Sequence, residues 1–110
     1  MAAYLGEFEQ HLLLVILRLG SEAFGSNIAR ELETQAGRKV SRGALYATLD
    51  RLERKGLVRW KPEPGGSARG GLPRRAYAVS AGGRAALAES RDRLRRLWCG
   101  VEHLLKGPVS

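Results

Sequence analysis

The sequence predicts a mainly α-helical protein with one small β-hairpin, on three observations. Apolar residues recur at helical spacing in segments 5–19, 24–35 and 41–55. Two short stretches, 57–61 and 74–79, read as strands and flank segment 62–73, whose four glycines and three prolines predict a loop. A last helical pattern follows, from residue 81 to about residue 105.

The first two helices have the spacing of a helix-turn-helix. Segment 5–19 is apolar on most sides, which is typical of a buried helix, and Gly20 follows it as a stop signal. Segment 24–35 buries a narrower face that includes Ile28 and Leu32, and Gly37 ends it. The four-residue turn 37–40 has the right length for a helix-turn-helix connection, with Val40 as the apolar residue inside it.

The third helix, from Ser41 to about Lys55, is the most informative segment. Leu45 and Leu49 belong to its apolar stripe, Ser41 is suited to cap its first turn, and Gly56 is suited to the left-handed conformation just past its end. A hairpin with a Gly- and Arg-rich loop follows directly. This order predicts a winged helix-turn-helix, in which the third helix enters a DNA groove and the hairpin, or wing, rests on the DNA backbone.

The last helix, capped by Ser80, carries a heptad pattern. Apolar residues stand seven apart, with Ser90 among the partner positions. The pattern predicts a homodimer joined through this helix, with these interface residues: Leu87, Leu94, Leu97, Trp98, Val101 and Leu104. We therefore divide the chain into a winged helix-turn-helix DNA-binding domain, residues 1–79, and a C-terminal dimerisation helix, residues 80–110.

The charge of the chain is high and unevenly placed. The formal net charge is +8. Residues 1–40 hold four Lys and Arg against five Asp and Glu, a net of −1, and residues 41–110 hold fifteen against six, a net of +9. A basic excess that begins at the third helix favours a polyanionic partner, double-stranded DNA.

The expected cellular location of the protein follows from its cysteine count and from the hydropathy of its sequence. Cys99 is the single cysteine, so no internal disulfide is expected. The longest apolar run, Leu12 to Leu17, is six residues, against about 20 for a membrane span. We expect a soluble, cytoplasmic protein without membrane association.

Taken together, these segments resemble the PadR family of transcriptional regulators, in its short form with a single C-terminal helix. The resemblance covers roughly residues 5–105 and is carried by segments 5–9, 23–25, 41–46, 49–58 and 74–83. It implies a homodimeric repressor that binds a palindromic operator, often in its own promoter. Two departures stand out: Ala76 precedes Tyr77 where the family often has Lys or Arg, and the short C-terminal part predicts no large effector-binding domain.

Nine residues are expected to contact DNA. Arg42 is suited to a guanine edge or to a phosphate, Gly43 to close backbone approach, and a wing arginine to a narrow minor groove. The full set is Ser41, Arg42, Gly43, Tyr46, Arg51, Lys61, Arg69, Arg74 and Arg75. The alternatives are a solvated helix with Tyr46 packed on the domain, a wing that only improves solubility, and a late third helix stabilised by an Asp50–Arg54 pair.

Trp98 and Cys99 carry more open hypotheses. Trp98 either lines a pocket between subunits for a small aromatic effector or simply packs the dimer core. Cys99 is expected to be inert rather than redox-active. No zinc-ligand spacing, nucleophile–base pair or nucleotide-binding loop occurs, so we expect no metal, no cofactor and no catalysis. A non-specific nucleic-acid binder and a winged-helix protein-interaction module are the competing functions.

Overall fold

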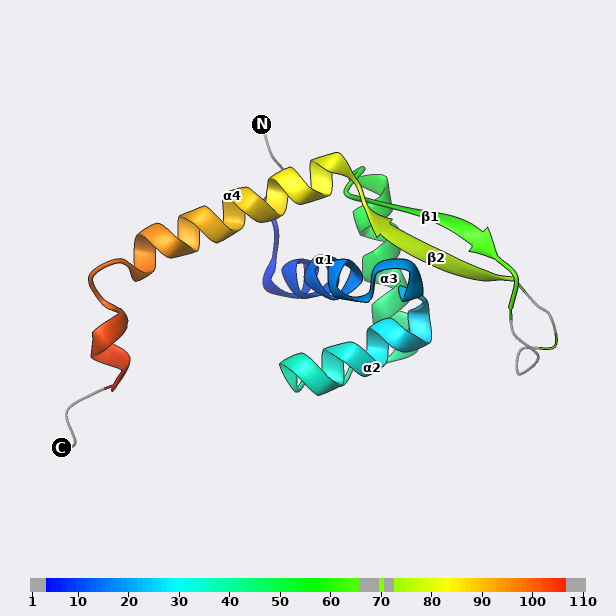
Figure 1. Cartoon of the computed structure of the whole chain (residues 1–110), viewed down its shortest axis with the longest axis horizontal. Coiled ribbons are helices and arrows are strands. Elements are labelled where there is room, and N and C mark those ends of the chain that lie inside the picture. The colour runs from blue at the N-terminus through cyan, green and yellow to red at the C-terminus, as the bar shows by residue number, and fades with distance from the viewer. Residues whose placement is uncertain (1–3, 66–69, 71–72, 107–110) are drawn as a thin grey trace.

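The computed structural model describes residues 4–65, 70 and 73–106, which form helices and one antiparallel hairpin (Figure 1). The elements in chain order are α1 (Glu7–Leu19), the 3-10 helix η1 (Gly20–Glu22), α2 (Gly25–Ala36), α3 (Arg42–Arg54), β1 (Val58–Glu63), β2 (Arg74–Val79), α4 (Ala81–Trp98) and the 3-10 helix η3 (Glu102–Lys106). The predicted fold class, mainly α with a small hairpin in winged helix-turn-helix order, is confirmed.

The core lies where α1, α2 and α3 meet beneath the base of the hairpin. The largest fully buried side chains come from these three helices: Leu12, Leu13, Ile16, Ile28, Leu32, Leu49 and Leu52. Each contributes about 1.5–3 kcal/mol by leaving water. The hairpin adds Val58, Tyr77 and Val79 to the same cluster. The apolar stripes read from the sequence therefore face the core as predicted.

Caps fix the ends of α3. The Ser41 hydroxyl accepts a hydrogen bond of 3.1 Å from the Ala44 N–H, as predicted for the N-cap. Past the other end, Gly56 has a φ of 74°, and the Leu57 N–H donates to the Leu52 carbonyl at 2.9 Å. The chain therefore leaves α3 in a sharp turn that leads directly into β1.

Two boundaries differ from the prediction by about two residues. The first helix begins at Glu7 rather than Leu5, because Gly6 caps it through an N–H that donates to Glu9 Oε1. β1 continues through Pro62 to Glu63, where the sequence predicted a loop. A two-stranded sheet tolerates this proline because every second N–H of each strand points outward and needs no ladder partner.

The hairpin is held against the helices on one edge. β2 spans the predicted residues and pairs with β1 in the register Trp60↔Tyr77 and Lys61↔Ala76. The Tyr77 N–H points to the other side of β2 and donates to the Ala23 carbonyl, just before α2, at 2.9 Å. This bond ties the wing to the start of α2, which matters for the site described below.

The last helix is shorter than predicted. Ser80 caps it as expected, accepting from the Gly83 N–H at 3.0 Å and donating to the Gly56 carbonyl at 2.6 Å. However, α4 ends at Trp98, the chain turns at Gly100 with a φ of 84°, and η3 follows. The prediction of one helix running to residue 105 is wrong, and so is a straight heptad pattern that continues through Val101.

Burial divides the predicted dimer residues into two groups. Leu87 and Ser90 are buried by their own chain, where Leu87 joins the core cluster. This burial corrects the expectation that Leu87 is free for a partner. Leu94, Leu97 and Trp98 are exposed, as are Val101 and Leu104 beyond the bend. We call the segment 91–106, the outer part of α4 with η3, the arm; it extends away from the helical body in Figure 1.

Candidate nucleic-acid interface

The start of α3 is open to solvent. Ser41, Arg42 and Gly43 are all exposed, and a β-carbon added at Gly43 would meet nothing within 4 Å. The Ser41 hydroxyl is engaged in the helix cap, which leaves Arg42 as the long polar side chain at this end. The N-terminal residues of a recognition helix are those that usually reach base edges, so the geometry of α3 is suited to that role.

Tyr46 joins α3 to the first residue of α2. Its ring is partly buried, and its Cζ stands 2.9 Å from where a β-carbon at Gly25 would lie. The Arg42 guanidinium lies 5.7 Å from the centre of the same ring. Tyr46 therefore packs on the domain and also places its hydroxyl beside the N-terminus of α2.

A cavity of about 630 Å³ opens between the start of α2, the exposed side of α3 and the end of β2. Its wall includes Gly25, Arg42, Tyr46, Asp50, Arg74 and Arg75; we call it the arginine groove. The N-cap of α2 is Phe24, which supplies no side-chain cap to the first N–H groups. Those donors and three guanidinium groups give the groove a positive potential, which suits a phosphate.

The two wing arginines are fixed by aromatic rings. The Arg74 guanidinium lies 3.6 Å from the centre of the buried Phe24 ring. The Arg75 guanidinium lies 4.2 Å from the centre of the Trp60 ring. Stacking of this kind attracts the guanidinium to the ring face and restricts a long side chain. Arg74 and Arg75 thus line the groove in defined positions.

Arg75 also has two polar partners. Its NH1 donates to Asp50 Oδ1 and to the Tyr77 hydroxyl, each at 3.5 Å. Burial raises the pKa of the Tyr77 phenol above its ordinary value, so that it stays neutral at physiological pH. Asp50, proposed from its spacing as a partner of Arg54, instead lies against a residue 25 positions away.

Two predicted contacts, Arg51 and Lys61, do not line this groove, and a third lies outside the described residues. Arg51 is exposed late on α3. Lys61 alternates with Trp60 along β1, so it lies on the opposite face of the hairpin from Arg75, and its Nζ stands 3.5 Å from Glu63 Oε1. Arg69 lies outside the described residues. The structure therefore brings together Arg42, Tyr46, Arg74 and Arg75, but not Arg51 or Lys61.

Sequence reasoning missed Asp50 as a site residue and the contribution of α2. Phe24, Gly25 and Ser26 line the groove, yet they carry no charge and show only as a helix start in the sequence. The signal that points to Asp50 is its position, four residues after Tyr46 and eight after Arg42, on one side of α3.

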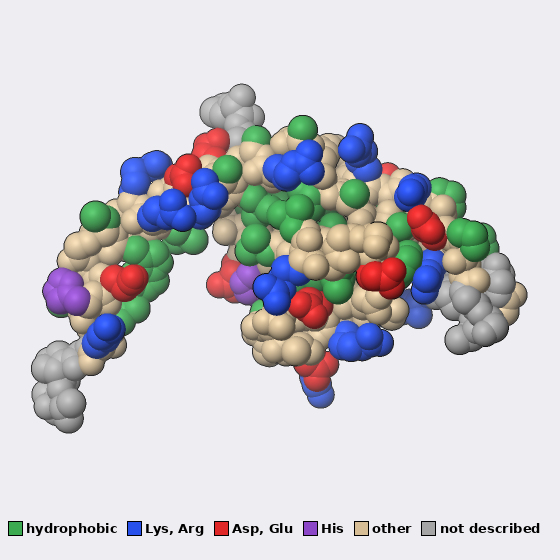
Figure 2. All heavy atoms as spheres, viewed as in Figure 1, with side chains coloured by type: hydrophobic (Ala, Val, Ile, Leu, Met, Phe, Trp, Pro, Cys, Tyr) green, Lys and Arg blue, Asp and Glu red, His purple; other side chains and the backbone are tan. Residues whose placement is uncertain are grey.

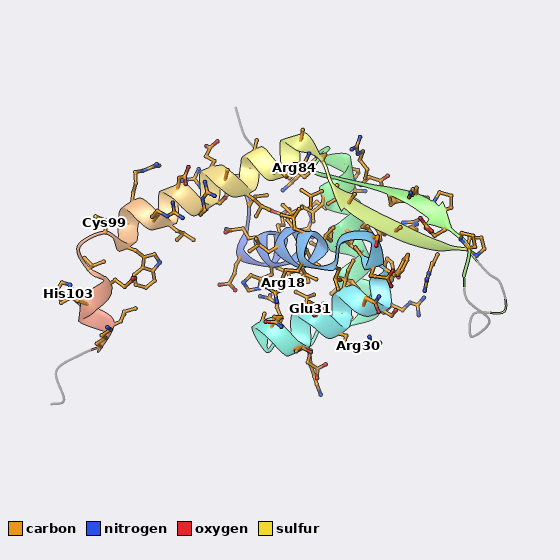
Figure 3. All side chains as sticks on the ribbon, viewed as in Figure 1. Arg18, Arg30, Glu31, Arg84, Cys99 and His103 are labelled. Carbon is orange, nitrogen blue, oxygen red and sulfur yellow. The ribbon has the colours of Figure 1, made fainter. Side chains whose placement is uncertain are left out.

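The arm is the second feature of functional interest. Figure 2 shows apolar side chains along its inner, concave side. Trp98 is 43% exposed and borders a shallow cavity of about 530 Å³ with Leu94 and Leu105. Cys99 and His103 lie far from the helical body in Figure 3. Among the described residues, no three His, Cys, Asp or Glu side chains are grouped to hold a metal ion.

Comparison with known families identifies the chain. Residues 13–89 match the model of the transcriptional regulator PadR-like family. The chain belongs to this family. Its members are transcriptional regulators rather than enzymes. A search of curated proteins finds no match, and no helix in the described ranges is long and apolar enough to cross a membrane.

Solved structures of PadR-like proteins share the fold. A PadR-like transcription factor from Bacteroides fragilis is 28% identical, with a TM-score of 0.68 over 88% of each chain. A PadR family regulator from Eggerthella lenta is 29% identical, with a TM-score of 0.62 over 90% of this chain and 87% of its own. Bacillus subtilis PadR in complex with operator DNA is 15% identical, with a TM-score of 0.61 over 76% of this chain and 47% of its own.

Proposed function

We propose that this PadR-like protein is a sequence-specific DNA-binding regulator that acts as a homodimeric repressor on a palindromic operator. The observation that carries the proposal is the arginine groove beside the open start of α3. Three arginines and an uncapped helix N-terminus converge there, and such a site suits a DNA phosphate. A phosphate in the groove would place the first turn of α3 in the adjacent major groove, with Arg42 at the base edges.

The wing would hold the backbone that flanks the major-groove contact. Arg74 and Arg75 project from β2 at the point where the hairpin meets α2 and α3. The relative with operator DNA supports this class of partner. Repression would follow when the bound dimer occludes polymerase.

The arm supports the dimer. The arm carries six exposed large apolar side chains, 43–70% accessible in the single chain, which is unusual for a protein surface that stays in water: Leu94, Leu97, Trp98, Val101, Leu104 and Leu105. A second copy would cover them and hold two α3 helices at half-sites about 34–36 Å apart. Such a dimer reads a palindrome because its two-fold axis matches that of the operator.

A small aromatic effector is a second, independent element of the proposal. The shallow cavity beside Trp98 is lined by Leu94, Trp98 and Leu105 together with the charged residues Arg91, Arg95 and Glu102. A planar molecule would stack on the indole between two arms. Fluorescence of Trp98 and DNA binding measured with aromatic compounds test it: quenching together with weaker DNA binding supports an effector, and neither effect contradicts it. We place the protein in the cytoplasm, where its DNA is.

The deciding experiment is fluorescence anisotropy with the DNA upstream of the protein's own gene and a scrambled duplex, at near-physiological salt. A preference of about 10³ or more supports a sequence-specific regulator. Comparable binding to both, with a steep salt dependence, would favour a non-specific nucleic-acid binder. Absence of binding to either would favour a winged-helix protein-interaction module.

A further inference from the structure

One carboxylate stands on the surface that we assign to DNA. Asp50 lies on the exposed side of α3, its side chain is 51% accessible, and it lines the arginine groove with Arg42 and Arg75. A negative charge at this position repels phosphates and weakens binding to any DNA. A residue that weakens all binding still increases specificity if it weakens binding to wrong sequences more.

The contacts of Asp50 indicate how it would discriminate. Asp50 meets Arg75 at 3.5 Å, while Trp60 and Tyr77 hold the same guanidinium from β1 and β2. Arg75 is thus fixed by three elements: the recognition helix and both strands of the wing. Its side chain is still 44% accessible, so the held guanidinium remains open to the groove.

We propose that Asp50 is a specificity-determining residue that acts by holding Arg75. This inference rests on the proposed function as a DNA-binding regulator. Held by Asp50, Arg75 bonds a phosphate only where the DNA brings one to its fixed position, as a matched operator would. Without Asp50, Arg75 keeps only the stacking on Trp60 and the hydrogen bond to Tyr77. Its guanidinium can then shift toward whichever phosphate is nearest, so binding to unrelated DNA gains most.

The test compares Asp50→Asn, Arg75→Gln and the double variant on two duplexes. One duplex is selected from a random-sequence pool by the wild-type protein, and the other is its scrambled version. Glu53→Gln is the matched control, because Glu53 is an exposed carboxylate on the same helix that does not line the groove. Affinity is measured by anisotropy over a series of salt concentrations.

We expect Asp50→Asn to tighten binding to the scrambled duplex by about fivefold near 0.15 M salt, with a salt slope steeper by about 0.9, as for one added phosphate contact. Binding to the selected duplex should change by less than about twofold, so the specificity ratio falls.

With Arg75→Gln in place, the effect of Asp50→Asn should shrink to that of the control. If Asp50→Asn tightens binding to the scrambled duplex as much in the Arg75→Gln background as in the wild-type protein, Asp50 acts by charge alone. That result would overturn the proposal. Loss of binding to the selected duplex only would mean that Asp50 reads a base, most directly a cytosine amino group, and would overturn it too.

A measurement without DNA separates this inference from the proposed function. The side-chain Nε–H signal of Arg75 in an NMR spectrum of the free protein should move in Asp50→Asn. It should move less in Glu53→Gln, because the Arg75 guanidinium lies 3.5 Å from Asp50 Oδ1, whereas Glu53 does not line the groove. Equal shifts in the two variants, or none in Asp50→Asn, refute the hold on Arg75, whatever the protein does with DNA. A wild-type protein that selects no duplex from the pool refutes the proposed function instead, and leaves the NMR result to decide whether the contact exists.

Discussion

Lys55 Nζ donates a hydrogen bond of 2.7 Å to Glu9 Oε2 and so joins the end of α3 to the first turn of α1. Glu9 is only 7% exposed, and its other oxygen accepts from the Gly6 N–H at 2.9 Å. Burial alone would raise the pKa of Glu9, but the hydrogen bonds from Lys55 and Gly6 and the charge of Arg51 outweigh it, and the pKa is lowered. The ionised carboxylate is therefore part of the folded structure.

The first prediction concerns stability against acid. Because the pKa of Glu9 is lower in the folded protein than its unfolded value of about 4.3, the pair stabilises the fold above that pH. The contribution is lost as the pH falls through the folded-state pKa. Glu9→Gln should reduce the free energy of unfolding by about 1–3 kcal/mol at neutral pH. The deficit should stay constant down to about pH 4.3 and shrink only below that pH. Urea unfolding across this range measures it.

Glu7→Gln is the control for that experiment. Glu7 pairs with Arg38 at 3.2 Å in the same helical turn, but its side chain is 79% exposed. An exposed pair contributes about 0–1 kcal/mol, so this variant should follow the wild-type protein closely. Equal losses in both variants, or a Glu9→Gln deficit that does not depend on pH, would contradict the assignment to the buried pair.

The second prediction concerns the contact between Tyr46 and Gly25. A β-carbon at residue 25 would overlap the Tyr46 hydroxyl and stand 2.9 Å from its Cζ. Gly25→Ala should therefore push the ring into the arginine groove and weaken DNA binding by about tenfold, equivalent to about 1.4 kcal/mol. Gly43→Ala is the steric control for folding, because the space beside Gly43 is open.

A mutant cycle isolates that steric cause. With Tyr46→Leu in place, the bulky ring is gone and Gly25→Ala should alter thermal stability by less than about 0.5 kcal/mol. Suppose instead that Gly25→Ala lowers thermal stability or DNA affinity as much in the Tyr46→Leu background as in the wild-type protein. The glycine is then needed for another reason, such as direct approach of DNA to the start of α2.

Local signals in the sequence were enough for most of the fold. Ser41 and Ser80 mark the helix starts because a cap depends only on residues three positions away. The start of β2 at Arg74 is equally local, since Pro73 precedes it. The end of α4 was misplaced because heptad spacing continues past Trp98, although Gly100 was a visible signal for a turn.

The site was harder to predict because its contacts are distant in sequence. Arg42, Arg74 and Arg75 could be named from charge and motif position, but the sequence does not reveal that Arg75 meets Asp50. Lys61 shows the converse: its charge is visible in the sequence, but the residue does not line the arginine groove, so its contact with DNA stays a prediction. Spacing gives the neighbours within one element, and tertiary packing decides which elements meet.

The third prediction distinguishes base contact from phosphate contact at Arg42. If Arg42 bonds a guanine edge, Arg42→Ala should weaken operator binding by about 1–3 kcal/mol and leave scrambled DNA less affected. A uniform loss on both duplexes, with a salt slope reduced by about 1, would assign it to a phosphate instead. Lys61→Ala is the control, and it should change affinity less than Arg42→Ala because Lys61 does not line the groove.

The last prediction tests the arm as the dimer interface. Leu94 is 47% exposed in the single chain, whereas Leu87, one heptad earlier, is buried in its own core. Leu94→Asp should therefore separate the dimer without unfolding the monomer, because a partner would have to bury an unpaired charge. Sedimentation should show the mass of one chain, with circular dichroism unchanged. Ala85→Asp adds the same charge at an exposed position nearer the start of α4, and it should remain dimeric.

Since a dimer also doubles the number of DNA contacts, Leu94→Asp should lose most of its operator affinity while each wing and α3 stay intact. An unchanged dimer mass in Leu94→Asp would place the interface elsewhere on the molecule.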